Sequence, residues 1–134
     1  MDRLKAKQLN VTTLAYVGDA AYELIIRQML VEHRAKDAGK LHHEAIAYVS
    51  STGQSTIAKK LCEREVLTEE EEHLLKRARN HRATSRPQNA DPKKYKWATG
   101  FEALIGFLYL AEDDERLQAI MEEALKIIQE SRNE

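Results

Sequence analysis

Apolar residues recur at helical spacing along most of the chain. The clearest case lies near the C-terminus, where Leu117, Ile120, Met121, Ala124, Leu125 and Ile128 repeat at three- and four-residue intervals. Residues 41–49 and 57–62 show shorter versions of this pattern, and no stretch alternates as a strand would. The pattern predicts an all-α fold of about six helices, near residues 13–32, 40–51, 54–66, 69–80, 95–111 and 114–130.

Several local signals place the ends of these helices. Gly39 and Gly53 fall where helical segments are expected to break. The sequence TEEE at 68–71 is typical of a capping box, in which Thr68 and Glu71 satisfy each other's backbone amides. Both prolines fall in residues 81–94, which we expect to form the one long irregular connection.

Composition places the chain among globular proteins. It has 134 residues, 43% hydrophobic and 32% charged, which suits one domain over 1–134. The N-terminus lacks the apolar core of a signal peptide and no apolar run has membrane length, so we expect a cytoplasmic protein without membrane association. The single cysteine, Cys62, falls at helical spacing with apolar neighbours and is interpreted as a core thiol.

The charges are separated along the chain although the formal net charge is only −1. Residues 76–96 hold eight Lys or Arg against one acid, whereas residues 112–134 hold eight acids against three Lys or Arg. The basic segment predicts either a surface that binds nucleic-acid phosphates or an ordinary solvated charge run. The candidate RNA-binding residues in it are Arg77, Arg79, Arg82, Arg86, Lys93 and Lys94.

Two apolar segments carry acids that a buried helix would not need. Asp19 follows Gly18 inside residues 14–30, with Glu23 one turn further on, and Glu102 is the only charge in residues 97–111. A glycine in a helix costs about 1 kcal/mol relative to alanine but lets another helix approach closely. The second segment has its own small residues at 100, 103 and 106. Two helices crossing at these small residues would bring Asp19 and Glu102 together.

The chemistry of such a pair has two interpretations. Two adjacent carboxylates repel unless a cation lies between them, and a site with few carboxylates suits Mg²⁺, which keeps several waters. Alternatively, each acid forms an ion pair with a basic side chain, for which Arg27 is the nearest candidate in sequence. The histidines show no metal-binding spacing, so a zinc site is not expected.

The motifs LAYVGDAAYEL (14–24) and TGFEALIGFLYL (99–110) resemble the two signatures of the ribonuclease III catalytic domain. The match is closer to the Mini-ribonuclease III branch, which has the nuclease domain alone, and the segments LHHEAIAYVSSTGQ and TEEEEHLLKRARN support it. The resemblance extends from Lys7 to about Leu110. By implication the chain would be an α-helical endonuclease domain without a double-stranded-RNA-binding domain.

The resemblance also implies an activity. It assigns Asp19 and Glu102 as catalytic and metal-binding residues, with Mg²⁺ as cofactor, double-stranded RNA as substrate and a homodimer as the active form. For the Mini branch it implies maturation of the ends of large-subunit (23S) ribosomal RNA precursors. The alternative function is a non-catalytic ribonuclease III-like dimer that binds RNA or acts as a scaffold.

Two positions depart from the pattern of full-length members, which carry further acids where this chain has Ala15 and Thr99. This difference leaves the number of metal ions open. Glu23 and Thr99 are candidates to support the site from beside it, since Thr99 lies one turn from Glu102 on the same helix face. Tyr16 stands where the family pattern has an aromatic residue that contacts the partner subunit. The alternative is that Tyr16 packs inside its own subunit.

Overall fold

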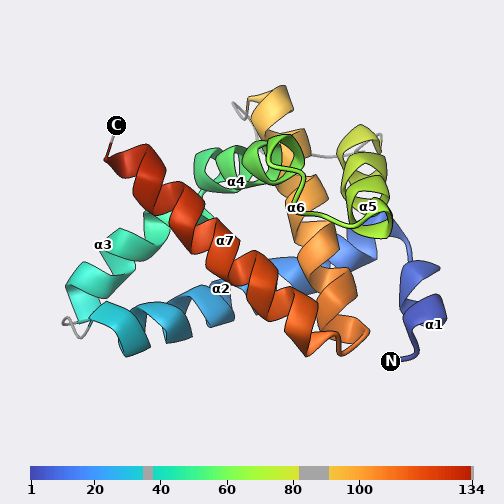
Figure 1. Ribbon diagram of the computed structural model, residues 1–134, viewed down its shortest axis with the longest axis horizontal. Helices are drawn as coiled ribbons and strands as arrows, with labels where there is room; N and C mark the ends of the chain where they lie inside the picture. The colour runs from blue at the N-terminus through green and yellow to red at the C-terminus, as the bar shows by residue number, and fades with distance from the viewer. Residues whose placement is uncertain (35–37, 82–90, 134) are drawn as a thin grey trace.

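A computed structural model describes residues 1–34, 38–81 and 91–133, and over these ranges the chain is helical with no strand. The helices are α1 (Arg3–Lys7), α2 (Val11–Arg34), α3 (Ala38–Val49), α4 (Ser51–Glu63), α5 (Glu69–Asn80), α6 (Pro92–Leu110) and α7 (Asp114–Arg132). Figure 1 shows their arrangement, with α6 running through the middle of the molecule.

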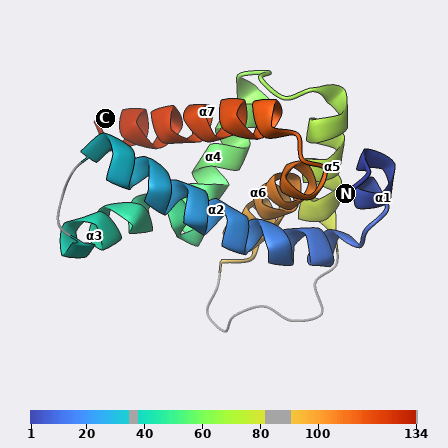
Figure 2. The same ribbon diagram turned by 90° about the horizontal axis from the view of Figure 1, so that it is seen from below.

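The central helix is α6, and its sequence explains its position. From residue 100 to residue 108 all side chains except that of Glu102 are buried, so this part of α6 has packing partners on every side. It packs most extensively against α2, and then against α5 and α4, while α7 crosses the face opposite α2 (Figure 2). Helix α6, which carries Glu102, is therefore enclosed by α2, which carries Asp19, and by α5, which carries several basic residues.

The all-α prediction is confirmed, and each of the six expected helices is present. The structure adds α1, whose five residues are too short to produce a periodic pattern. It also begins α6 at Pro92 rather than at 95, because Asp91 caps the helix by accepting from the amide of Lys93 and proline suits the first helical turn. The capping box of Thr68 and Glu71 is confirmed, with both hydrogen bonds present.

The expectation that Gly39 and Gly53 break helices is wrong. Both lie inside the first turn of a helix, and the break before α4 is made by Ser50, whose hydroxyl accepts from the amide of Gly53. Gly53 is required for a different reason: a Cβ there would overlap the backbone carbonyl of Ala47 at the end of α3. The glycine thus permits a tight α3–α4 corner rather than ending a helix.

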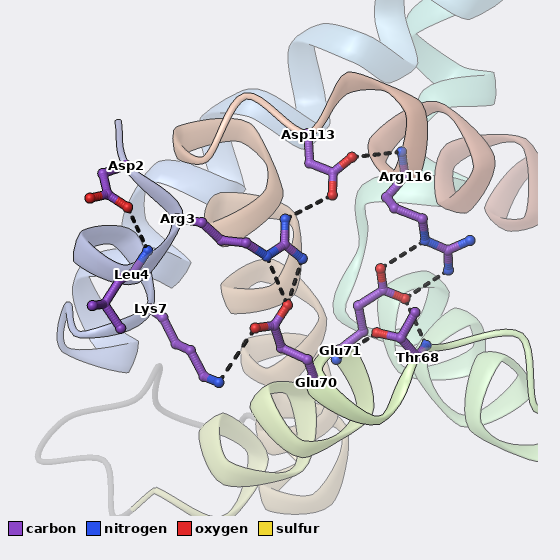
Figure 3. Close-up of polar contacts among 9 residues, drawn as sticks. All are labelled: Asp2, Arg3, Leu4, Lys7, Thr68, Glu70, Glu71, Asp113 and Arg116. Atoms are coloured by element: carbon purple, nitrogen blue, oxygen red, sulfur yellow. Dashed lines mark hydrogen bonds and ion pairs between the residues drawn. The ribbon is translucent and has the colours of Figure 1, made fainter.

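Ion pairs hold the corner where α1, α5 and α7 meet (Figure 3). Arg3 pairs with Glu70 of α5 and with Asp113, which caps α7, and its guanidinium lies 5.0 Å from the ring centroid of Phe107. Deeper in the same corner the fully buried Glu71 accepts two hydrogen bonds from Arg116. These contacts join residues far apart in sequence and fix α5 against the start of α7.

No helix in the described part of the chain is long and apolar enough to cross a membrane. Cys62 is half-buried and packs against the core, where burial raises the pKa of its thiol. This agrees with its interpretation as a packing residue.

Candidate active site

The candidate site forms where α2 crosses α6 at two glycines. A Cβ at Gly18 would overlap the carbonyl oxygen of Glu102, and a Cβ at Gly106 would overlap the carbonyl oxygen of Leu14. The two backbones are therefore in direct contact, which only glycine allows. Gly100, which we expected at this crossing, instead faces α5, where a Cβ would lie 2.6 Å from the carbonyl oxygen of Leu75.

The crossing brings Asp19 and Glu102 together. Their carboxyl groups are close enough to share a hydrogen bond. The description of both acids as buried is wrong for Asp19, whose side chain is exposed, while Glu102 is partly buried. The reason is that Gly18 takes the position facing α6, so Asp19, one residue further on, lies at the edge of the crossing. The pair thus has one inner and one solvent-facing member.

The inner carboxyl group is strongly perturbed. Burial raises the pKa of Glu102 to about 8, and the hydrogen bond and negative charge of Asp19 contribute further. A carboxyl group with this pKa keeps its proton at neutral pH when only another acid is beside it. Among the described residues no basic side chain forms an ion pair with Asp19 or Glu102. The ion-pair interpretation therefore does not hold for these two acids.

Gln54 of α4 is a residue of this site that the sequence analysis missed. Its side chain is 4% exposed and lies beside Glu102, where it partly offsets the rise in the pKa of that carboxyl group, and its amide nitrogen donates to the carbonyl of Val49 at 3.0 Å. Its buried Oε1 has no hydrogen-bond partner in the described structure. A buried amide oxygen without a partner is costly, and a cation would satisfy it. No sequence signal marked it, because α4 holds several other polar residues.

The two residues expected beside the site have local partners. Glu23 pairs with Arg27 at 2.7 Å, so the ion-pair interpretation holds for this acid. The hydroxyl of Thr99 donates to the carbonyl of Tyr95 at 2.9 Å, one turn back along α6. Its oxygen can still accept a hydrogen bond from a water, but the structure places no charged side chain against it.

The number and type of possible ligands at the site indicate which metal ion it could bind. The described residues contain no group of three or more His, Cys, Asp or Glu side chains that could hold a metal ion. Two carboxylates and one amide oxygen are hard oxygen donors, too few for a closed zinc site but suited to Mg²⁺, which retains waters and takes substrate phosphate as a ligand. The donor set at the crossing therefore fits Mg²⁺.

The expected RNA-binding residues have different surroundings. Arg77 and Lys93 are exposed, and Arg77 lines a shallow hollow of α5 with His73, Lys76, Asn80 and His81. The other two described residues make contacts: Arg79 lies over Trp97 and hydrogen-bonds to Asn80, and Lys94 hydrogen-bonds to Thr52. Arg82 and Arg86 lie outside the described residues.

The two tyrosines of α2 differ sharply. Tyr16 is 82% exposed, which contradicts packing inside its own subunit. Tyr22 is fully buried; its hydroxyl donates to the carbonyl of Tyr48 and its ring packs edge-on against Phe101. Leu24 and Val31 continue the exposed apolar side of α2 beyond Tyr16.

Comparison with known proteins agrees with this geometry. The family model of the ribonuclease III domain matches residues 12–113, which include both helices of the crossing. The fold and the paired acids thus define a nuclease domain, and the chain belongs to the ribonuclease III family, in its Mini-ribonuclease 3 branch. It is accordingly an endoribonuclease.

Individual relatives support the assignment to the Mini-ribonuclease 3 branch. The chain is 42% identical to a Mini-ribonuclease 3 of Enterococcus faecalis, over 93% of this chain and 95% of the relative. It is 38% identical to that of Staphylococcus aureus, over 92% of both chains. The crystal structure of a Fusobacterium nucleatum protein superposes with a TM-score of 0.76 at 30% identity, and covers 94% of this chain and 98% of that one.

Proposed function

We propose that this protein cuts double-stranded RNA in a Mg²⁺-dependent reaction at the crossing of α2 and α6. The observation that carries the proposal is the pairing of Asp19 with Glu102 in a chain of the ribonuclease III family. Two carboxyl groups that share a hydrogen bond, with no basic partner in the described structure, are suited to binding a divalent cation.

The residues of the site have different roles in this proposal. Asp19, which is exposed, and Glu102, which is partly buried, would together hold the ion, Asp19 from the solvent side and Glu102 from the protein side. Gln54 lies beside Glu102, where its side chain can support the ionised carboxylate. When bound, Mg²⁺ would supply a Lewis acid that activates water and stabilises charge on the phosphate.

The proposed substrate is a duplex at the ends of large-subunit ribosomal RNA precursors, cut on both strands by a homodimer. An RNA duplex presents shape, phosphates and 2′-hydroxyls, which suits a site that has acids for the metal and basic residues nearby. Arg77, Lys93 and Lys94 support phosphate binding, because each is exposed and lies at the end of α5 or the start of α6. Cutting two strands requires two sites, which a two-fold dimer supplies.

The exposed apolar side of α2 supports the dimer. Tyr16, Leu24 and Val31 lie on one helix with 60% or more of each side chain exposed. Large apolar side chains at helical spacing in solvent are typical of an interface. An interface that includes Tyr16 would lie beside Asp19, three residues further along α2.

Cleavage assays test the proposal directly. The purified protein is incubated with a duplex carrying a precursor end, an unrelated duplex and the separate single strands, each with Mg²⁺ and with chelator. We expect paired cuts in duplex RNA with Mg²⁺ only, and faster cutting of the precursor end. Cleavage that continues in chelator would contradict the metal assignment. Equal cutting of both duplexes would contradict the ribosomal substrate, and cutting of single strands alone would contradict the duplex substrate.

A further inference from the structure

The indole of Trp97 contacts two basic side chains from different helices. Trp97 belongs to the first half of α6, which passes between α4 and α5 (Figure 1). The guanidinium carbon of Arg79, from α5, lies 4.6 Å from the centroid of the indole, and the Nζ of Lys59, from α4, lies 6.0 Å from it. Both distances are in the range of cation–π contacts.

The positive charges of these two side chains are not neutralised by a neighbouring acid in the described structure. Among the described residues neither Arg79 nor Lys59 has a carboxylate partner, whereas Arg3, Arg64 and Arg116 are all paired with acids. An aromatic face attracts a cation without neutralising it, so the ammonium of Lys59 and the N–H groups of Arg79 other than Nε, which donates to Asn80, can bind an anion. Packing against the indole also limits the rotamers of both side chains, which lowers the entropy cost of that binding.

A third basic side chain lies one turn back along α6. Lys94 hydrogen-bonds through Nζ to the hydroxyl of Thr52 at 3.3 Å, in the first turn of α4. Trp97 precedes Glu102 by five residues, so it is about 7.5 Å from Glu102 along the helix axis. Basic side chains from α4, α5 and α6 therefore gather around the first half of α6, the helix that also carries Glu102.

We propose that Trp97 is a positioning residue that holds Arg79 and Lys59 to bind phosphates of the RNA backbone. The inference rests on the proposed function for the identity of the ligand. It goes further by extending the RNA-binding surface to α4, where Lys59 lies outside the basic segment of 76–96. It also gives the tryptophan a role in substrate binding rather than only in packing.

Trp97 is the only tryptophan of the chain, so its fluorescence reports this site alone. The intact protein is titrated with a short RNA duplex in chelator, which prevents cleavage, while the anisotropy of a dye on the RNA measures binding independently. We expect the Trp97 emission to change with the same midpoint as the anisotropy and to recover when salt is added. An emission that stays constant while the RNA binds overturns the inference, as does a duplex that does not bind at all.

Two neighbouring lysines of α4 provide a matched comparison. Lys59 contacts the indole, whereas Lys60 pairs with Glu63 at 3.4 Å, and both are exposed. The logarithm of the RNA binding constant falls with the logarithm of the salt concentration, and Lys59→Ala is expected to make this slope shallower by about one unit. Lys60→Ala is expected to leave the slope unchanged. An unchanged slope in Lys59→Ala, or an equal loss in both variants, overturns the inference.

Substitutions of Trp97 separate positioning from packing. We expect Trp97→Leu to raise KM about two- to fivefold with kcat retained, since the loss of cation–π contacts affects RNA binding alone. Trp97→Phe, which keeps an aromatic face, should restore most of the loss. If Trp97→Leu lowers only the melting temperature and leaves KM and the salt slope unchanged, Trp97 is a packing residue and the inference is wrong. A protein that binds duplex RNA with these properties but never cuts it would contradict the proposed function and not this inference.

Discussion

Asp19 and Glu102 are the residues on which the proposed chemistry depends. Asp19→Asn and Glu102→Gln each remove one anionic ligand while they keep the shape of the side chain. We expect cleavage of duplex RNA to fall by at least about 100-fold in either variant, because removal of a single stabilising group at a reacting phosphate costs about 3 kcal/mol. Single-turnover rates measure the loss, and circular dichroism checks that the helical content is retained.

The two variants should differ in their response to metal. In the proposed site Glu102 would hold the ion from the protein side, so raising the Mg²⁺ concentration should recover part of the activity of Glu102→Gln. Glu23→Gln is the control, because Glu23 pairs with Arg27 and does not share the hydrogen bond of Asp19 and Glu102. Near-normal turnover by Asp19→Asn would rule out its assigned role.

At the scale of helices, the crossing of α2 and α6 depends on two glycines. Gly18→Ala or Gly106→Ala would place a Cβ inside the backbone of the facing helix, so the helices must separate. We expect the free energy of unfolding to fall by about 3 kcal/mol or more, at the upper end for overpacked cores, since backbone cannot move aside as a side chain can. Urea unfolding monitored by circular dichroism measures the change.

The control is another helical glycine, Gly39, which is exposed in α3. Gly39→Ala should leave stability unchanged or raise it by about 0.5–1 kcal/mol, as is usual for alanine in a helix. If Gly18→Ala were as stable as the parent protein, α2 and α6 would not be in the close contact that brings Asp19 and Glu102 together.

The corner held by Arg3 predicts a dependence on pH. The hydrogen bonds of Arg3 lower the pKa of both Glu70 and Asp113, so the ionised acids stabilise the fold above their usual pKa values. This contribution is lost as pH falls below about 4, where both acids take up protons. Arg3→Met should lower stability at pH 7 by about 1 kcal/mol, a small effect because the pairs are partly exposed.

The comparison is made by thermal unfolding of both proteins from pH 7 to pH 3. The difference in stability should shrink as the acids of the corner are protonated. A difference that stays constant over this range would show that Arg3 acts through its packing on Phe107 alone.

Sequence patterns predicted these helices well where the signal was local. The capping box of Thr68 and Glu71 depends on residues three apart, and the apolar side of α7 repeats within the helix. The missed features join distant residues. The buried pair of Glu71 with Arg116 and the contact of Gln54 with Glu102 arise only when helices pack. The exposure of Asp19 likewise depends on which side of α2 faces α6, which periodicity alone left open.

At the scale of the whole molecule, the exposed apolar side of α2 predicts a two-fold dimer with Tyr16 in its interface. Buried aromatic residues are frequent interface anchors, and truncating one often costs about 2 kcal/mol or more; in an isologous interface each anchor acts twice. Because Tyr16 is 82% exposed in the single chain, Tyr16→Ala should weaken association without lowering the stability of the folded subunit.

Analytical ultracentrifugation across a dilution series tests this prediction, with Tyr16→Phe as the matched control that keeps the ring. We expect Tyr16→Ala to dissociate at concentrations where the parent protein and Tyr16→Phe remain dimeric. Double-strand cuts should be lost in parallel, with nicks in one strand in their place, since each subunit of the proposed dimer cuts one strand. A Tyr16→Ala protein that stays as tightly dimeric as its parent would place the interface elsewhere, and the aromatic ring would then be free to contact RNA beside Asp19.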